Sequence, residues 1–498
     1  MDDIVFGTEI EFASAGALPP GQAARLVKSI LFQDRRFGLI DPAPREWDEE
    51  PGNGGHLFNG ARLYLDSGHI EYASAECRTL RDIVEQENAA SAVLLDTVER
   101  QEMNRKLFFI KNNTDHLGNT FGYHENYSIV TSPRSRELVL GLLPFLTTRQ
   151  LYAGAGMTLN PEEAGGRLPF HMSQRAAFVS VDVSHRVRFG GRPIINLRDE
   201  PLSERTGLRR LHVVVGDANQ SQYATALKVG STALVAQLLA AGWNPELYLD
   251  EAVRSIKSIS RNPGGPWPVE LVDGRTISAI DVQRTYLEAA ASAFGGRDAD
   301  TDWTLAAWNE CLDGLATDPE CLIGRVDWVT KLSELRDYAD DSPEGWADPD
   351  LVKLDLAYHH VDPTVSLFSE LQRRGLMNRL VSGPVNPLAI PEGTRAGARG
   401  RIVRALSEAR ADSHIDWKDI QHNLGALASW ENQLYLVYQY IEHWRELDEF
   451  GGWSFVPYLV DWDGIGVRGR IFEMPDPFET YDDEAMEFAG AVERYLDG

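Results

Sequence analysis

The chain has few cysteines and lacks the segments that mark secreted or membrane proteins. Its 498 residues include only three cysteines, Cys77, Cys311 and Cys321, with no CxxC spacing. This excludes a disulfide framework and a CxxC metal or redox motif, and it indicates reduced thiols. No basic segment followed by an apolar one opens the sequence, and no apolar run is long enough to span a bilayer. We therefore expect a cytoplasmic protein with no membrane partner.

Positive charge is also scarce. There are 48 lysines and arginines against 75 aspartates and glutamates, for a formal net charge of -27. Such a surface disfavours nonspecific binding to nucleic acids or anionic membranes, since both carry negative charge. The sequence also has no GxxxxGK[ST] loop, glycine-rich kinase loop, HExxH or GxSxG motif. An ATP-using enzyme of this composition would instead hold magnesium with carboxylates on an antiparallel sheet, and the magnesium would hold the phosphates.

What the sequence does contain is an unusual polar strand. If residues 62–66 form a strand, Leu63 and Leu65 face the core, while Arg62, Tyr64 and Asp66 share the opposite face. A cation, a phenol and a carboxylate in one row must be solvated, paired or bound to something. The pattern fits either a half-exposed strand with a surface ion pair or a binding face.

A second such strand is predicted near the start of the chain. In residues 4–12 the apolar side chains alternate with Glu9 and Glu11, which share one face. Two carboxylates so placed repel each other, and a divalent cation with a preference for oxygen ligands, such as Mg²⁺, would relieve the repulsion. The alternative is an edge strand with one wet face.

Two further strands carry polar residues. Residues 122–130 place His124 on one face together with Asn126, as a structural histidine or a metal ligand. Residues 210–215 place Arg210 and His212 together. Arginine is the natural stabiliser of a transferring phosphoryl group.

Three arginines are candidates for contacts with the phosphates: Arg175, Arg198 and Arg210. We assign Arg198 and Arg210 as catalytic candidates and Arg175 as a candidate ATP contact. Any of the three could equally be a structural ion-pair partner.

Outside these strands, helical periodicity dominates. We expect helices at 21–32 and 79–105, and mostly helical structure from 221 to 380. Residues 35–55 are rich in proline, glycine and acidic residues and are predicted to form a loop, either a substrate lid or an insertion.

A proline- and glycine-dense segment at 382–394 marks a linker. We therefore predict two domains, residues 1–384 and 385–498. Four arginines follow the linker: Arg395, Arg399, Arg401 and Arg404. They either hold a phosphate or an acidic partner, or they neutralise neighbouring carboxylates.

Many short segments, in order along nearly the whole chain, resemble one enzyme family. They are GTEIEF (7–12), NGARLYLDSGHIEYASAEC (59–77), KNNTDHLGNTFGYHENYSIV (111–130), PFLTTRQL (144–151), SQRA (173–176), RPIINLRDEP (192–201), RRLHVVVGDAN (209–219), LKVG (227–230), DWVTKL (327–332), LDLAYH (354–359), TRAGARG (394–400), IDW (415–417) and DPF (476–478). The chain resembles the Pup ligases and depupylases, relatives of glutamine synthetase and other carboxylate-amine ligases.

The resemblance implies an α+β fold. Its large glutamine synthetase-like domain would have a curved antiparallel sheet covered by helices, and a small C-terminal α/β domain would follow. An insertion near 424–466 interrupts the small domain relative to the family. The implied cofactors are ATP and Mg²⁺.

The resemblance also implies roles for single residues. By this likeness Glu9, Tyr64 and Glu71 are magnesium ligands, and Glu11, His124 and His212 are further candidates because they face the same way. Contacts with ATP are implied for three residues: Arg62, Ser74 and Trp417. Asp66 is implied as the catalytic carboxylate.

The implied reaction joins the small protein modifier Pup to a lysine of a protein. ATP phosphorylates the terminal glutamate of Pup to an acyl phosphate, and Asp66 takes a proton from the attacking lysine amine. The segments 144–151 and 192–201 favour the ligase, whereas the spacing from Asp66 to Glu71 is that of the depupylase. Alternatives are therefore a depupylase or deamidase, a phosphotransferase acting on a small molecule, and a non-enzymatic binding protein.

Overall fold

The structure is a computed structural model that describes residues 4–34, 36–41, 52–103, 106–130, 135–184, 191–197, 208–411, 458–467, 470–478 and 483–497. Within these residues, a ten-stranded sheet runs through the larger part of the molecule in the order β10-β11-β12-β7-β1-β5-β4-β3-β2, with β6 also paired to β1. Each pair of neighbours is antiparallel except β10 and β11, which are parallel. The strands are β1 (Val5–Gly16), β2 (Gly38–Ile40), β3 (Gly54–Leu57), β4 (Arg62–Asp66), β5 (His69–Ala73), β6 (Leu107–Ile110), β7 (Tyr123–Val130), β10 (Val181–Ser184), β11 (Pro193–Asn196) and β12 (Leu208–Val213).

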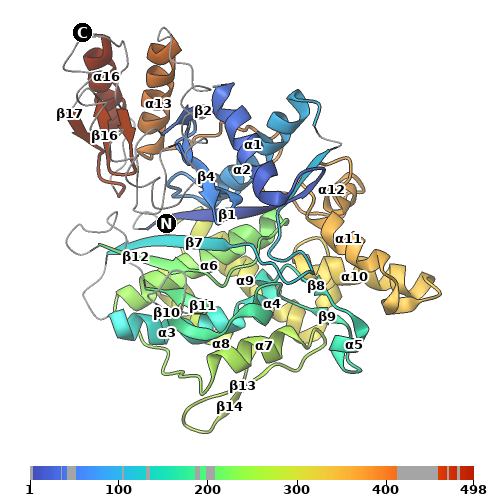
Figure 1. Cartoon of the computed structure of the whole chain (residues 1–498). Coiled ribbons are helices and arrows are strands. Elements are labelled where there is room, and N and C mark those ends of the chain that lie inside the picture. The colour runs from blue at the N-terminus through green and yellow to red at the C-terminus, as the bar shows by residue number, and fades with distance from the viewer. Residues whose placement is uncertain are drawn as a thin grey trace.

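One face of the sheet packs against helices. Ile4, just before β1, and Phe6 on β1 belong to a buried cluster with α3 and α6, while Ile10 and Phe12 of β1 belong to a second cluster with α1 and α2. The alternation of a strand places Glu9 and Glu11 on the opposite face. In Figure 1, α1 and α2 lie above β1 and β7, and α6 lies below these two strands.

The helices of the large unit follow the expected periodicity. They are α1 (Pro20–Gln33), α2 (Leu80–Arg100), α3 (Ser135–Thr148), α4 (Gln150–Ala153), α5 (Pro161–Ala164), α6 (Gln222–Ala240), α7 (Ala252–Ser260), α8 (Ala279–Phe294), α9 (Ala299–Thr317), α10 (Asp327–Asp341), α11 (Asp350–Tyr358) and α12 (Leu367–Arg373), with 3₁₀ turns η1 (Ala176–Phe178), η3 (Pro319–Leu322) and η4 (Gly345–Ala347). Two antiparallel strand pairs complete this unit, β8 (Met157–Thr158) with β9 (Phe170–His171) and β13 (Pro268–Glu270) with β14 (Thr276–Ser278). None of the helices among the described residues is both long and apolar enough to cross a bilayer.

The C-terminal part has a hydrophobic cluster of its own. Helix α13 (Ala396–Ala411) and helix α16 (Asp483–Asp497) pack with the three-stranded sheet of β15 (Tyr458–Val460), β16 (Gly464–Val467) and β17 (Arg470–Glu473). Figure 1 shows this unit beside β2 at the upper left. Leu39 of β2 and Phe58, which directly follows β3, share its cluster, so the two units meet along β2 and just beyond the end of β3. The division at 384/385 stays a prediction, and most of the predicted insertion at 424–466 lies outside the described residues.

Two expectations about local structure were wrong. The predicted loop at 35–55 contains β2 and the start of β3. Glycines permit this pairing, since a Cβ on Gly38 would lie 2.3 Å from the carbonyl oxygen of His56. The helix expected at 79–105 ends at Arg100, because Glu102 adopts a left-handed φ of 54° and the Met103 N–H bonds back to the carbonyl of Val98.

Candidate active site

The hairpin of β4 and β5 carries the acidic residues that the sequence singles out. Its two-residue turn consists of Ser67 (φ 50°) and Gly68 (φ 89°), the left-handed pair that suits a tight hairpin. The resulting register sets Asp66 opposite His69 and Tyr64 opposite Glu71. Because directly opposed residues point to the same face, one side of this hairpin collects these polar groups.

Three carboxylates converge at this hairpin: Glu11, Asp66 and Glu71. We call these three residues the Glu71 cluster. Each offers an oxygen within 4.8 Å of the others. The register of β1 against β5 sets Glu11 directly opposite Glu71. Burial raises the pKa of Glu71 well above its usual value, and the negative charges of Glu9, Glu11 and Asp66 raise it further. The neighbouring carboxylates thus disfavour ionisation of Glu71, and a bound cation would relieve this repulsion. The repulsion expected between Glu9 and Glu11 stays a prediction.

Tyr64 and Arg62 extend the same face of β4. Burial, followed by the charges of Glu71 and Glu9, raises the pKa of the Tyr64 phenol well above its usual value. The phenol thus stays protonated in the absence of a cation. The guanidinium carbon of Arg62 lies 4.5 Å from the centre of the Tyr64 ring, and Arg62 is buried. The structure confirms that Arg62, Tyr64 and Asp66 share one face of β4. Their roles in binding and catalysis stay predictions.

A second group, the Glu9 cluster, consists of Glu9, His124 and His212. Each contributes one possible ligand atom within 4.8 Å of the others. Glu9 Oε2 lies 3.0 Å from His124 Nδ1 and 3.7 Å from His212 Nε2. The two imidazole rings meet edge to face, with centroids 5.2 Å apart. Strand β7 supplies His124 opposite Glu9, and β12 supplies His212 opposite Asn126.

Two neighbours hold the other oxygen of Glu9. Asn126 Nδ2 and Arg210 Nη2 each donate to Oε1 at 3.0 Å, and Arg210 Nε donates to Asn126 Oδ1 at 2.8 Å. Burial opposes ionisation of Glu9, but the bond to His124 and the charges of His212 and Arg210 hold the pKa of Glu9 well below its usual value. Glu9 is therefore an oriented carboxylate at neutral pH.

Gly122 separates the two clusters. A Cβ at this position would lie 2.7 Å from Glu11 Oε1 and 2.7 Å from His124 Nε2. The lack of a side chain here leaves room for ligand atoms of both clusters to face the same space. The sequence analysis missed this residue.

Arg175 and Ser74 occupy different surroundings. Arg175 is buried, and its Nη1 is 3.5 Å from the carbonyl oxygen of Phe121. Burial lowers the pKa of Arg175, and the charge of Glu11 opposes this shift in part. The influence of Glu11 indicates that the guanidinium lies near the Glu71 cluster. Ser74 Oγ accepts a bond from the Thr8 N–H at 2.9 Å and donates to the Ala75 carbonyl at 3.0 Å, which fastens β1 to the end of β5.

The remaining predicted site residues, Arg198 and Trp417, lie outside the described residues. Another tryptophan, Trp462, follows β15 and repeats the Asp-Trp pair of 416–417. Its ring centroid is 5.4 Å from that of His56, which pairs with Arg62 in the sheet. His69 was also missed, although its Nδ1 is 3.8 Å from Glu11 Oε2.

The two clusters fit divalent cations. The Glu71 cluster offers only carboxylate oxygens, the donors that Mg²⁺ prefers. The Glu9 cluster adds two imidazoles, which suit transition metals as well. Both lie on the face of the sheet opposite the packed helices, so a cation there would not displace the hydrophobic core.

Comparisons with known proteins agree with this arrangement. The family model described as Pup-ligase protein matches residues 25–421. A Pup--protein ligase of Rhodococcus opacus is 38% identical over 382 residues, covering 74% of this chain and 84% of the relative. A Pup--protein ligase of Acidimicrobium ferrooxidans is 39% identical over 383 residues, covering 74% and 83%.

Two solved structures are also similar. The ligase PafA in its complex with the prokaryotic ubiquitin-like protein Pup matches with a TM-score of 0.77 and 29% identity, covering 100% of this chain and 93% of that one. PafA in complex with ADP matches with a TM-score of 0.70 and 31% identity, covering 89% and 90%. These matches confirm the expected α+β fold. The chain belongs to the Pup-ligase family.

Proposed function

We propose that this chain is an ATP-dependent ligase that joins a carboxylate of Pup to the amine of a lysine on a target protein. The observation that carries this proposal is the convergence of the Glu9 and Glu71 clusters on one sheet face, in a chain whose relatives are Pup--protein ligases. The related PafA has been seen with both Pup and ADP, which supports Pup and ATP as substrates here.

The metal ligands that we propose are Glu11 and Glu71 of the Glu71 cluster, the three residues of the Glu9 cluster, and Tyr64. Glu11 and Glu71 would hold one Mg²⁺, with Tyr64 beside them, and Glu9 with His124 and His212 would hold a second ion. When bound, Mg²⁺ supplies charge neutralisation for the phosphates. Arg210, which bonds Glu9 and Asn126, orients the Glu9 carboxylate.

The other residues act on substrate. Transfer of the terminal phosphoryl group of ATP to a Pup carboxylate gives ADP and an acyl phosphate. Arg175, buried near the Glu71 cluster, stabilises the negative charge of the moving group. The lysine nitrogen then attacks the acyl carbon, phosphate leaves, and Asp66 accepts the amine proton. Asp66 is suited to this because it is only half-buried at the end of β4.

Contacts with ATP are proposed for Arg62, Ser74 and Trp462. Trp462 lies next to His56, and His56 belongs to β3, the strand paired with the one that carries Arg62. The flat ring of Trp462 can stack on the base of ATP. Arg198 and Trp417 keep their predicted roles without structural support. We further propose a reducing cytoplasm as the site of action, since the three cysteines are free.

The test is a conjugation assay with purified chain, Pup, a lysine-bearing protein and Mg-ATP. We expect a covalent conjugate, detected by mass, and one ADP per bond. Absence of conjugate with every acceptor would overturn the proposal. Release of free Pup from a conjugate would favour the depupylase, and ADP formation with a small metabolite alone would favour the phosphotransferase.

A further inference from the structure

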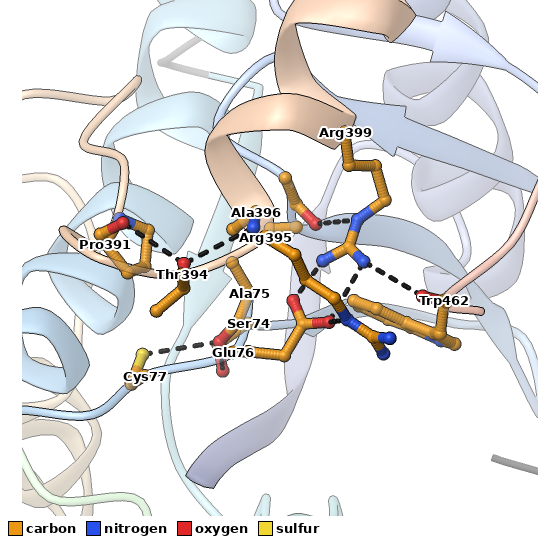
Figure 2. A network of polar contacts seen from close by, with 12 residues as sticks. Ser74, Ala75, Glu76, Cys77, Pro391, Thr394, Arg395, Ala396, Arg399 and Trp462 are labelled. Atoms are coloured by element: carbon orange, nitrogen blue, oxygen red, sulfur yellow. Dashed lines mark hydrogen bonds and ion pairs between the residues drawn. The ribbon is translucent and has the colours of Figure 1, made fainter. Parts of the chain in front are cut away.

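A cluster of buried charges joins the C-terminal unit to the large sheet. Glu76 lies between two arginines of the 394–400 segment, as Figure 2 shows. Arg395 Nε donates to Glu76 Oε1 at 2.7 Å, and Arg399 Nη1 donates to the same oxygen at 3.0 Å. Arg399 Nη2 makes a further bond to Glu76 Oε2. Two alternatives were open for the arginines that follow the linker, and Arg395 and Arg399 fit the second, since they neutralise a neighbouring carboxylate.

Arg399 also binds the segment that leads into the β4–β5 hairpin. Its Nε donates to the carbonyl oxygen of Gly60 at 3.0 Å. Gly60 precedes β4 by two residues, and Glu76 follows β5 by three. One guanidinium therefore binds both chain segments at the base of the β4–β5 hairpin, which carries Tyr64, Asp66 and Glu71.

The backbones approach closely at this contact. Gly60 has a left-handed φ of 84°, and a Cβ there would lie 2.7 Å from the carbonyl oxygen of Ala396. A Cβ on Gly400 would lie 2.1 Å from the carbonyl oxygen of Phe58. Helix α13 thus lies directly against the turn that leads into β4, and glycine at positions 60 and 400 permits this approach.

Residues that flank the C-terminal strands enclose the cluster from the other side. Arg395 donates to the Pro475 carbonyl at 3.0 Å and to Asp463 at 3.1 Å. The Trp462 ring lies 4.5 Å from the guanidinium carbon of Arg399, and Figure 2 shows it beside that side chain. Both arginines and Glu76 are hence enclosed between the units.

The charges of the cluster depend on one another. Arg399 is fully buried and Arg395 is 5% exposed. Burial opposes ionisation of Glu76, but the two arginines lower the pKa of Glu76 to about 2. Removal of the carboxylate charge would leave two buried cations close together, which is far more costly than loss of a surface pair.

We propose that Glu76, Arg395 and Arg399 form a positioning clamp that sets the hairpin of β4 and β5 through docking of the C-terminal unit. None of the three is a catalytic residue. Their effect on activity rests on the proposed function, because the hairpin carries the proposed metal ligands and base. The clamp makes the C-terminal unit part of the active site without contact with the reacting atoms.

The test compares Glu76→Gln with Val492→Ala. Val492 is fully buried in the core of the C-terminal unit, so its truncation destabilises that unit without change to the clamp. We expect Glu76→Gln to speed amide hydrogen exchange in residues 60–74 by about tenfold or more. A tenfold change corresponds to the loss of an interaction that shifts a pKa by about one unit. The KM for Mg-ATP should rise by a similar factor, whereas Val492→Ala should leave both values at those of the parent.

Arg399→Lys provides the second variant. It keeps the buried positive charge but replaces the planar guanidinium, whose Nε and Nη1 atoms bind Gly60 and Glu76 in fixed directions, with a single nitrogen. We therefore expect the same faster exchange in 60–74. It carries the test if Glu76→Gln does not fold. Exchange at the parental rate in 60–74, or equal acceleration by Val492→Ala, would overturn the clamp. If the parental chain forms no conjugate, the proposed function fails while the exchange result still decides the clamp.

Discussion

Glu9 and Glu71 lie on neighbouring strands of one sheet face, yet their pKa values are shifted in opposite directions. The hydrogen bond to His124 and nearby positive charges outweigh burial and keep Glu9 ionised. Burial and the nearby carboxylates instead favour the protonated form of Glu71. The same sheet face thus holds one satisfied carboxylate and one that pays an electrostatic penalty in the metal-free protein.

We predict that Glu71→Gln stabilises the metal-free protein. The folded-state pKa of Glu71 is raised, so the folded state binds more protons than the unfolded chain between about pH 4.3 and the raised value. The stability of the parent therefore falls as pH rises through that window, and the loss is complete above it. Near pH 7 with a chelator, Glu71→Gln should melt about 1–3 °C higher than the parent.

The control for this prediction is Glu9→Gln. The folded-state pKa of Glu9 is lowered, so its stabilisation is present above the unfolded value and lost only as pH falls through the folded one. Glu9→Gln should cost about 1–3 kcal/mol near pH 7, since it weakens bonds to charged partners. Mg²⁺ should raise the melting temperature of the parent and have little effect on Glu71→Gln. Equal signs for the two variants would contradict the assignment of opposite shifts.

Asp66→Asn should abolish conjugation while it leaves nucleotide binding intact. An amide cannot accept the amine proton, and loss of a general base costs about 10²- to 10⁴-fold in rate. The fold should tolerate the change, because Asp66 is only half-buried and accepts a 3.3 Å bond from Ser67. Single-turnover rates and equilibrium binding of ATP separate the two effects. A conjugation rate close to that of the parent would remove Asp66 from the mechanism.

Gly122→Ala should weaken cation binding by about tenfold or more, as changes beside metal ligands commonly do. The new methyl group would displace Glu11 or His124, because its Cβ would lie 2.7 Å from each. Titration calorimetry with Mn²⁺ and Mg²⁺ measures the affinity. The matched control is Gly264→Ala, since no atom lies within 4 Å of a Cβ at Gly264. If both variants bind cations as the parent does, Gly122 does not border the cation sites.

Much of the site follows from strand periodicity. Alternation alone places Glu9 and Glu11 on one face of β1 and Tyr64 and Asp66 on one face of β4, and the structure has both rows. The position of His69 was also accessible, because the two-residue Ser67-Gly68 turn fixes the register that sets it opposite Asp66. The family and the fold, inferred from ordered short segments, were confirmed by the comparisons.

Other features depend on contacts between distant segments. No local pattern shows that Arg399 reaches Glu76 and Gly60, more than 300 residues earlier in the chain. Gly122 has no side chain to attract notice, although it borders both clusters. The strands in 35–55 were missed for a related reason, since glycine is read as a loop signal but here allows close backbone pairing.

Arg149→Met tests whether a buried ion pair anchors the sheet behind the site. Glu125 lies on β7, next to His124, and is fully buried. Arg149 binds both of its oxygens at 2.7 Å, while Tyr127 donates to one of them at 2.6 Å. Removal of the arginine leaves a buried carboxylate without its counter-charge, which costs about 3–5 kcal/mol.

Urea-induced unfolding should therefore show a large loss of stability in Arg149→Met. The control is Lys353→Ala, which breaks an exposed 2.6 Å pair with Asp350 and should cost less than about 1 kcal/mol. Cation binding should also weaken in Arg149→Met, because the same strand presents His124 to Glu9 on its opposite face. Similar losses of stability in the two variants would mean that β7 is held by its apolar contacts rather than by this pair.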